Sequence, residues 1–176
     1  MGVFAAEASR QYRMQKIAFK YAVAFLFLML LINVGICSPA AEAIQGKWLA
    51  PDESSAGVTS VVDLYVRHEH LFGRILITRN AQGQEIHPIC EKCPGPLRGM
   101  PIKGMEFIRD LKPDSRGWVD GQVLDLRPGI TQGMFASCDV SVDREKVHFF
   151  GYLLSRAFGK VSIWTRLKDD DLFLSR

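Results

Sequence analysis

The residues best suited to chemistry are Cys90 and Cys93, in the stretch HPICEKCPG at residues 87–95. A Cys-x-x-Cys pair can be a thiol redox centre, part of a zinc site or a short disulfide. Redox catalysis requires the first cysteine at the N-terminus of a helix, where the helix dipole lowers the pKa of the thiol. A Pro-Gly-Pro run follows Cys93 directly and disfavours such a helix. We therefore do not expect a redox centre.

A zinc site would need about four ligands. His87 and the two loop cysteines have suitable spacing, and Cys138 is the candidate fourth ligand. However, Cys138 falls on the apolar face of a predicted strand, so we expect it to be a buried, small apolar residue. We therefore predict a Cys90–Cys93 disulfide and no metal. Pairing of Cys138 with either loop cysteine is the alternative.

Other polar clusters do not form a catalytic pattern. His68, Glu69 and His70 fall in a predicted turn, where they are expected to be solvated. Asp120 and Asp125 differ by an odd number along one predicted strand, so they face opposite sides and are poorly placed for acid–base catalysis. Phosphate-binding and Ser-His-Asp motifs are absent from the sequence. We predict a protein that is not an enzyme and uses no cofactor.

The first 43 residues have the pattern of a secretory signal peptide. Basic residues precede the apolar run YAVAFLFLMLLINVGIC at 21–37, and Ala41-Glu42-Ala43 fits a small-x-small cleavage motif. We predict a signal helix, cleavage after Ala43 and export to the periplasm or beyond the cell. Residues 1–13 could be an over-called start, because Met14 opens a conventional signal by itself. The alternative is an uncleaved segment that tethers the protein to the membrane.

The remaining chain is nearly neutral and is expected to form a single domain at 44–168, followed by a short acidic and apolar tail at 169–176. Without residues 1–43 it has 18 Lys and Arg against 17 Asp and Glu, a net charge of +1. We therefore expect no nucleic-acid partner, and no membrane contact beyond the signal segment. The sequence leaves the oligomeric state open.

Short β-type segments with turn signals between them recur along this domain, and long helical patterns are absent. In 134–142, for example, Cys138 and Val140 face one way while Ser137 and Asp139 face the other. The predicted strands are 44–50, 58–68, 71–79, 101–111, 118–126, 134–142, 146–154 and 159–167.

Eight consecutive strands with mostly short turns predict an all-β fold, an eight-stranded antiparallel up-and-down barrel. Closure removes the exposed strand edges, and eight strands leave space for a packed interior or one small ligand. A two-sheet sandwich is the alternative.

Trp48 on the first strand and Arg166 on the last are expected to meet where the barrel closes. The guanidinium could lie over the indole and seal one end, a cation–π contact worth roughly 0.5–2 kcal/mol. Gly46 would allow a close backbone approach. Trp164 and Tyr152 belong to a late aromatic cluster, and we group them with Trp48 and Arg166 as candidate ligand-binding or end-cap residues.

The order and spacing of several blocks resemble the secreted bacterial family called domain of unknown function 2147, over roughly residues 45–168. The resemblance implies export and a small lipocalin-like, or calycin-like, barrel, without an established activity. In place of the family's Asp-Pro turn, this chain has Asp125-Leu126-Arg127-Pro128-Gly129. The family-motif residues that we match are Gly46, Trp48, Gly73, Pro101, Gly104, Trp118, Gly121, Asp125, Cys138, Gly151, Gly159, Trp164 and Arg166.

These observations lead to two functional hypotheses. The first is an exported, non-enzymatic barrel that binds a small apolar or amphipathic molecule. The second is an envelope interaction or assembly scaffold, with a solid barrel that contacts another protein through loops 80–100 and 127–133.

Overall fold

A computed structural model describes residues 43–52, 55 and 57–168 of the chain. The predicted signal peptide, apart from Ala43, and the tail at 169–176 lie outside the described residues. Within those residues, no helix is both long enough and apolar enough to cross a bilayer.

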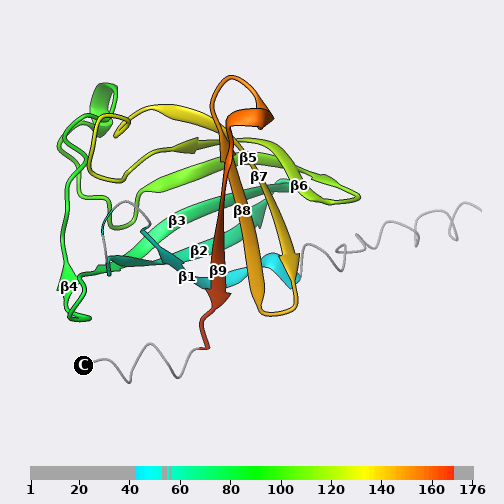
Figure 1. Ribbon diagram of the computed structural model, residues 1–176, viewed down its shortest axis with the longest axis horizontal. Coiled ribbons are helices and arrows are strands. Elements are labelled where there is room, and N and C mark those ends of the chain that lie inside the picture. The colour runs from blue at the N-terminus through cyan, green and yellow to red at the C-terminus, as the bar shows by residue number, and fades with distance from the viewer. Residues whose placement is uncertain (1–42, 53–54, 56, 169–176) are drawn as a thin grey trace, which may run out of the picture. The chain divides into compact units, whose positions relative to one another are not determined.

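The described part consists of β-strands and two short 3-10 helices (Figure 1). The helices are η1 (Gly95–Leu97) and η2 (Arg156–Phe158). The strands are β1 (Gly46–Pro51), β2 (Thr59–Arg67), β3 (His70–Arg79), β4 (Glu85–Ile86), β5 (Glu106–Asp114), β6 (Gly117–Leu124), β7 (Phe135–Asp143), β8 (Lys146–Tyr152) and β9 (Lys160–Arg166).

Eight of these strands close into an antiparallel barrel, which confirms the predicted fold class. Neighbours along the sheet run β2-β1-β9-β8-β7-β6-β5-β3, and β3 pairs with β2 to complete the circle. The two-residue β4 lies outside this circle and pairs with the end of β3. Because one continuous ladder closes on itself, the two-sheet sandwich is excluded.

The alternation of side chains fills the barrel as the sequence pattern predicts. On β7, Cys138 and Val140 are buried in the core, whereas Ser137 and Asp139 face outward. On β2, Val62 and Leu64 contribute to the same core. The period of two along each strand therefore places one apolar face in the interior.

Most predicted strand boundaries differ from the structure by one or two residues, and two of the differences are informative. The strand predicted at 101–111 begins only at Glu106, because Pro101 makes one isolated bridge to Ile89 and Gly104 has a left-handed φ of 82°. Proline cannot donate a ladder hydrogen bond, and the turn at Gly104 redirects the chain before β5. His70 is the first residue of β3, so the turn between β2 and β3 consists of His68 and Glu69.

The two ends of the barrel differ in their connections. The turn end holds the tight turns β2–β3, β5–β6 and β7–β8, together with the start of β1 and the end of β9. The loop end holds the longer connections, and in Figure 1 the connection 87–104 rises along the left side, whereas 125–134 and 153–159 lie near the top. Alternate connections share an end because the strands are antiparallel.

Candidate functional site

Arg166 closes the turn end of the barrel. Its guanidinium carbon lies 4.1 Å from the centre of the Trp48 ring, in the cation–π geometry expected from the sequence. The same guanidinium donates to the backbone oxygens of Gln45, at 3.0 Å, and of Ala43. A Cβ on Gly46 would lie 3.1 Å from the guanidinium nitrogen, so glycine gives the arginine space here.

The indole of Trp48 also fastens the segment that precedes β1. Its Nε1 donates to the backbone oxygen of Ile44 at 2.9 Å, and both side chains are fully buried. Trp48 and Arg166 are direct register partners across β1 and β9. One contact therefore joins the chain before the first strand to the end of the last strand.

Trp164 and Tyr152 occupy other places. Trp164 is buried, stacks on Phe149 at a ring distance of 5.0 Å and donates from Nε1 to the Ser162 hydroxyl at 3.2 Å. Tyr152 is half-buried at the far end of β8, next to Phe150 and 5.0 Å from the guanidinium carbon of Arg156. The structure therefore does not gather the four residues into one end cap.

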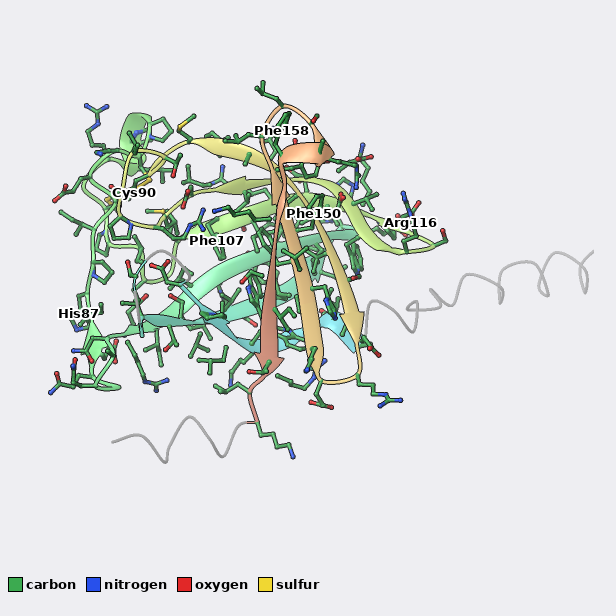
Figure 2. The ribbon with its side chains drawn as sticks, in the orientation of Figure 1. His87, Cys90, Phe107, Arg116, Phe150 and Phe158 are labelled. Atoms are coloured by element: carbon green, nitrogen blue, oxygen red, sulfur yellow. A yellow bond between two sulfur atoms is a disulfide. The ribbon has the colours of Figure 1, made fainter. Side chains whose placement is uncertain are left out.

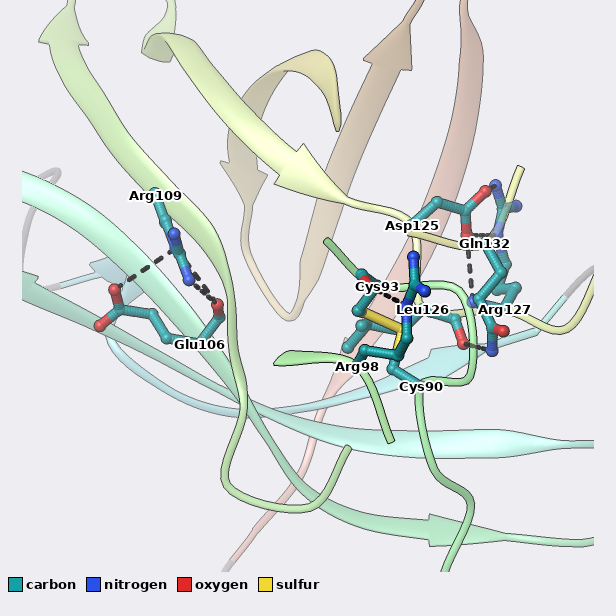
Figure 3. The surroundings of a disulfide bond; sticks show 9 residues. All are labelled: Cys90, Cys93, Arg98, Glu106, Arg109, Asp125, Leu126, Arg127 and Gln132. Atoms are coloured by element: carbon teal, nitrogen blue, oxygen red, sulfur yellow. Dashed lines mark hydrogen bonds and ion pairs between the residues drawn. A yellow bond between two sulfur atoms is a disulfide. The ribbon is translucent and has the colours of Figure 1, made fainter. Parts of the chain in front are cut away.

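Cys90 and Cys93 are joined in a disulfide, as predicted, and both are completely buried (Figure 3). The loop around them is fixed by backbone bonds from Cys90 N to Met100 O, at 2.9 Å, and from Gly99 N to Cys90 O, at 2.8 Å. The disulfide thus stands at the base of a compact loop that is anchored on its own backbone.

This disulfide loop packs against the connection 125–134. Lys92 Nζ donates to the backbone oxygen of Gly129 at 2.8 Å. A Cβ on Gly133 would lie 2.1 Å from the Lys92 oxygen, so only glycine permits the observed approach. Within 125–134, Leu126 and Gln132 are buried, and the Gln132 amide donates to the Leu126 oxygen at 3.4 Å. Together the two connections form a cover for the loop end.

Asp125 shapes its side of the cover. One carboxylate oxygen accepts from the backbone N–H of Arg127, and the other accepts from the Thr131 hydroxyl at 2.8 Å. Burial by itself raises the pKa of Asp125, but hydrogen bonds from Arg127 and Thr131 outweigh it, so the pKa lies below its usual range. From the sequence, Asp125 was a family-motif residue and a poorly placed partner for Asp120. An Asp side chain that accepts from the backbone N–H two residues on is typical of a turn.

The metal and thiol alternatives are not supported by these positions. His87 is exposed and lies 3.8 Å from Glu85, while the two loop cysteines are bonded to each other. Cys138 is fully buried, and burial, with a smaller effect of Asp139, raises the pKa of its thiol far above the usual range. Within the described ranges, no three His, Cys, Asp or Glu side chains are grouped to hold a metal ion.

Three motif glycines make space inside the barrel. A Cβ on Gly73 would crowd Leu64, one on Gly121 would lie 2.2 Å from Leu111, and one on Gly151 would approach Phe149. Gly159 lies against the Phe150 ring in the same way. These residues therefore serve packing rather than binding.

Trp118, another motif residue, is buried in the core with 3% of its surface exposed. Its Nε1 has no hydrogen-bond partner, and it is the one buried side-chain nitrogen or oxygen of this kind among the described residues. A buried, unpaired donor is costly and calls for an explanation. The sequence could not indicate it, because the lack of a partner depends on the tertiary surroundings.

A hollow of about 440 Å³ lies on the outer face of β2, β3 and β5. Arg67 stacks 4.0 Å above the Phe72 ring in this hollow, and Tyr65 donates to Glu106 at 2.5 Å. Burial, together with the hydrogen bond and charge of Glu106, raises the pKa of Tyr65. Because these charged groups already pair with one another, the hollow offers a ligand few unused polar atoms.

Large apolar side chains are exposed around the cover. We call Ile89, Met100, Ile130, Met134, Leu154 and Phe158 the apolar rim. Phe135 and Leu153 flank it, and in the described residues the other exposed large apolar side chains are Val161 and Ile163, on β9. None lies in the three tight turns of the opposite end. The loops 80–100 and 127–133, which we expected from the sequence to make contacts, hold Ile89, Met100 and Ile130, whereas the connection with Leu154 and Phe158 was not expected.

A family model described as "Uncharacterized protein conserved in bacteria (DUF2147)" matches residues 46–166. The chain belongs to this family. The DUF2147 domain thus extends from the start of β1 to the end of β9, so the contact between Trp48 and Arg166 lies at its two limits.

A solved structure described as "Protein HP1028 from the human pathogen Helicobacter pylori belongs to the lipocalin family" is similar to this DUF2147 protein. The TM-score is 0.60 at 20% sequence identity, and the match covers 73% of this chain and 85% of that chain. This likeness confirms a lipocalin-like barrel. No curated protein matches the sequence.

We predict that Arg166→Ala lowers the free energy of unfolding by about 2 kcal/mol, because it removes a cation–π contact and hydrogen bonds that close the barrel. Urea denaturation measures the change. Arg156→Ala is the matched control, since Arg156 also contacts an aromatic ring and carboxylates but lies on the outer surface. Equal losses in the two variants would contradict a special role for Arg166.

We predict that Asp125→Asn reduces the loss of stability in acid. The unfolded carboxyl has a pKa of about 3.9. Since the folded pKa is lower, the ionised group stabilises the fold above that pH, and the contribution disappears as the pH falls through the folded pKa. Melting temperatures measured from neutral to acidic pH should therefore converge for the wild type and the variant. Asp143→Asn, in an exposed turn, is the control, and curves that stay parallel would disprove the assignment.

Proposed function

We propose that this DUF2147 protein is an exported, non-enzymatic barrel that binds a small amphipathic molecule in its interior. The observation that carries the proposal is the unpaired Nε1 of Trp118 within an apolar core. A ligand with an apolar body and one acceptor group, such as a carbonyl or carboxylate, would satisfy that donor.

The difference between the two ends supports a direction of entry. The turn end is sealed by Arg166, Trp48 and the buried Ile44. The loop end is covered by connections that meet through a lysine-to-carbonyl bond and the close approach at Gly133. Separating two connections disturbs fewer contacts than opening a strand ladder, so we infer that a ligand enters beneath the disulfide loop.

The chemistry of the cysteines supports a binding role over a catalytic one. Burial raises the pKa of the Cys138 thiol, so the thiol stays protonated at neutral pH and does not form the nucleophilic thiolate. The other two described cysteines are consumed by the disulfide. A disulfide also suits an oxidising compartment, which agrees with the export expected from the N-terminal sequence.

The proposal predicts a stoichiometric amphipathic molecule in the organic-solvent extract of the purified protein, detected by mass spectrometry. An empty extract would contradict it and would favour the scaffold, whose barrel is solid and whose loops make the contacts. Trp164 is not needed for binding, because its Nε1 already donates to Ser162. Tyr152 pairs with Ser137 at the loop end of β7, whereas Trp118 pairs with Val140 farther along that strand.

Trp118→Phe keeps most of the ring and removes the donor. We expect this variant to bind a dansyl-labelled fatty acid up to about tenfold more weakly, the usual limit for one hydrogen bond. Fluorescence titration measures the dissociation constant. Trp164→Phe is the matched control, because its Nε1 already has Ser162 as a partner. If both variants bind as the wild type does, Trp118 does not hold the ligand.

A further inference from the structure

The apolar rim projects far into solvent. Leu154 is fully exposed, Ile130 has 93% of its surface exposed and Phe158 has 79% exposed. Figure 2 shows Phe158 and the disulfide loop at Cys90 along the same upper edge of the barrel, whereas Arg116 lies on the tip of the β5–β6 turn. Leucine, isoleucine and phenylalanine side chains grouped at one end of a domain are characteristic of an interaction surface.

Basic residues accompany the rim. The connections 87–104 and 125–134, together with 153–160, contain six Lys or Arg. Three of these form ion pairs with carboxylates, namely Lys103 with Glu85, Arg127 with Asp125 and Arg156 with Asp139. Lys92 and Arg98 donate to backbone carbonyl oxygens rather than to carboxylates, so these bonds leave their positive charge uncompensated.

We propose that the apolar rim docks the barrel onto the surface of an anionic lipid bilayer. The exposed leucine, isoleucine, methionine and phenylalanine side chains enter the boundary between headgroups and acyl chains, while lysine and arginine stay at the level of the headgroup phosphates. This inference does not depend on what the barrel binds, although it would place the loop end, where we infer ligand entry, against lipid.

The arrangement fits a bilayer better than a protein partner. The core of a protein interface is depleted of charged residues. Here Arg98 stands between Ile89 and Met100 in the sequence. A lipid interface accepts this interleaving, because long basic side chains extend toward the headgroups while neighbouring apolar side chains insert.

The test uses the full chain, so that the apolar N-terminal sequence is the same in every sample. The background carries Cys37→Ser, so that the dye does not label that thiol. A cysteine is introduced by Ile130→Cys, Leu154→Cys or, at the turn end, Glu69→Cys, and it is labelled with the environment-sensitive dye NBD. Buried Cys138 and the disulfide-bonded pair are not accessible to the reagent. Vesicles contain either equal parts of phosphatidylglycerol and phosphatidylcholine or phosphatidylcholine alone.

We expect a blue shift and an intensity increase at positions 130 and 154 with the anionic vesicles, a weaker response with phosphatidylcholine, and no response at position 69. Phe158→Ser with Leu154 intact, in the protein labelled at position 130, should lower the vesicle partition coefficient about tenfold, because one large apolar side chain is lost. Lys92→Gln with Arg98→Gln should weaken anionic binding about fivefold per residue, whereas Arg116→Gln should not.

Three results would overturn the proposal. The first is an unchanged spectrum at positions 130 and 154, which would leave the rim in water. The second is an equal response at position 69, which would mean adsorption through another part of the chain. The third is a blue shift that grows with protein concentration in the absence of vesicles, which would assign the rim to a second copy of this chain. Circular dichroism verifies that each variant retains the β-sheet signal.

Discussion

The contact between the Arg166 guanidinium and the Trp48 indole is the constraint on which the barrel depends. β1 and β9 share only two paired positions, Trp48 with Arg166 and Leu49 with Thr165. The other neighbours in the barrel share more paired positions, from three between β3 and β5 to nine between β2 and β3. So short a ladder contributes little by itself, and the cation–π contact with the two backbone bonds from the guanidinium makes up part of the difference.

That closure gives the molecule two unlike ends. At the turn end, strands meet through tight turns and the interior is sealed by an aromatic ring and a buried isoleucine. At the loop end, a disulfide loop and the Asp125 turn hold each other in place, with glycine at the point of closest approach. Since rigid ladders surround the interior on all sides, the cover is the part that can open with the smallest loss of contacts.

Much of the fold could be predicted from the sequence because a barrel repeats one simple rule. Alternating residues such as Cys138 and Asp139 identify faces, and the first and last strands must become neighbours if the sheet closes. The start of β5 was missed because Pro101 and Gly104 stand within an otherwise strand-like run, where propensity and periodicity gave no boundary. The disulfide was predicted correctly, because redox catalysis required a helix start and zinc an additional ligand that the loop does not supply. The third alternative, pairing with Cys138, was disfavoured because Cys138 falls on the apolar face of its strand.

The candidate sites were harder to predict, for a physical reason. Whether Trp118 Nε1 has a partner depends on every group that packs around it, and no local pattern encodes an absent bond. The apolar rim combines three connections that are distant in the sequence, so it exists only after the strands are aligned. Tyr152 was grouped with the wrong residues because aromatic clustering in the sequence ignored the length of β8, which separates it from the turn end.

The pairing of the first strand with the last also determines when the barrel can close during synthesis of the chain. A ribosome releases β1 first and β9 last, so the edge of β1 has no neighbour on that side until nearly the whole domain has emerged. The barrel therefore cannot close until β9 has emerged, and a product that stops before Trp164 would retain two open edges, the kind of template on which chains aggregate.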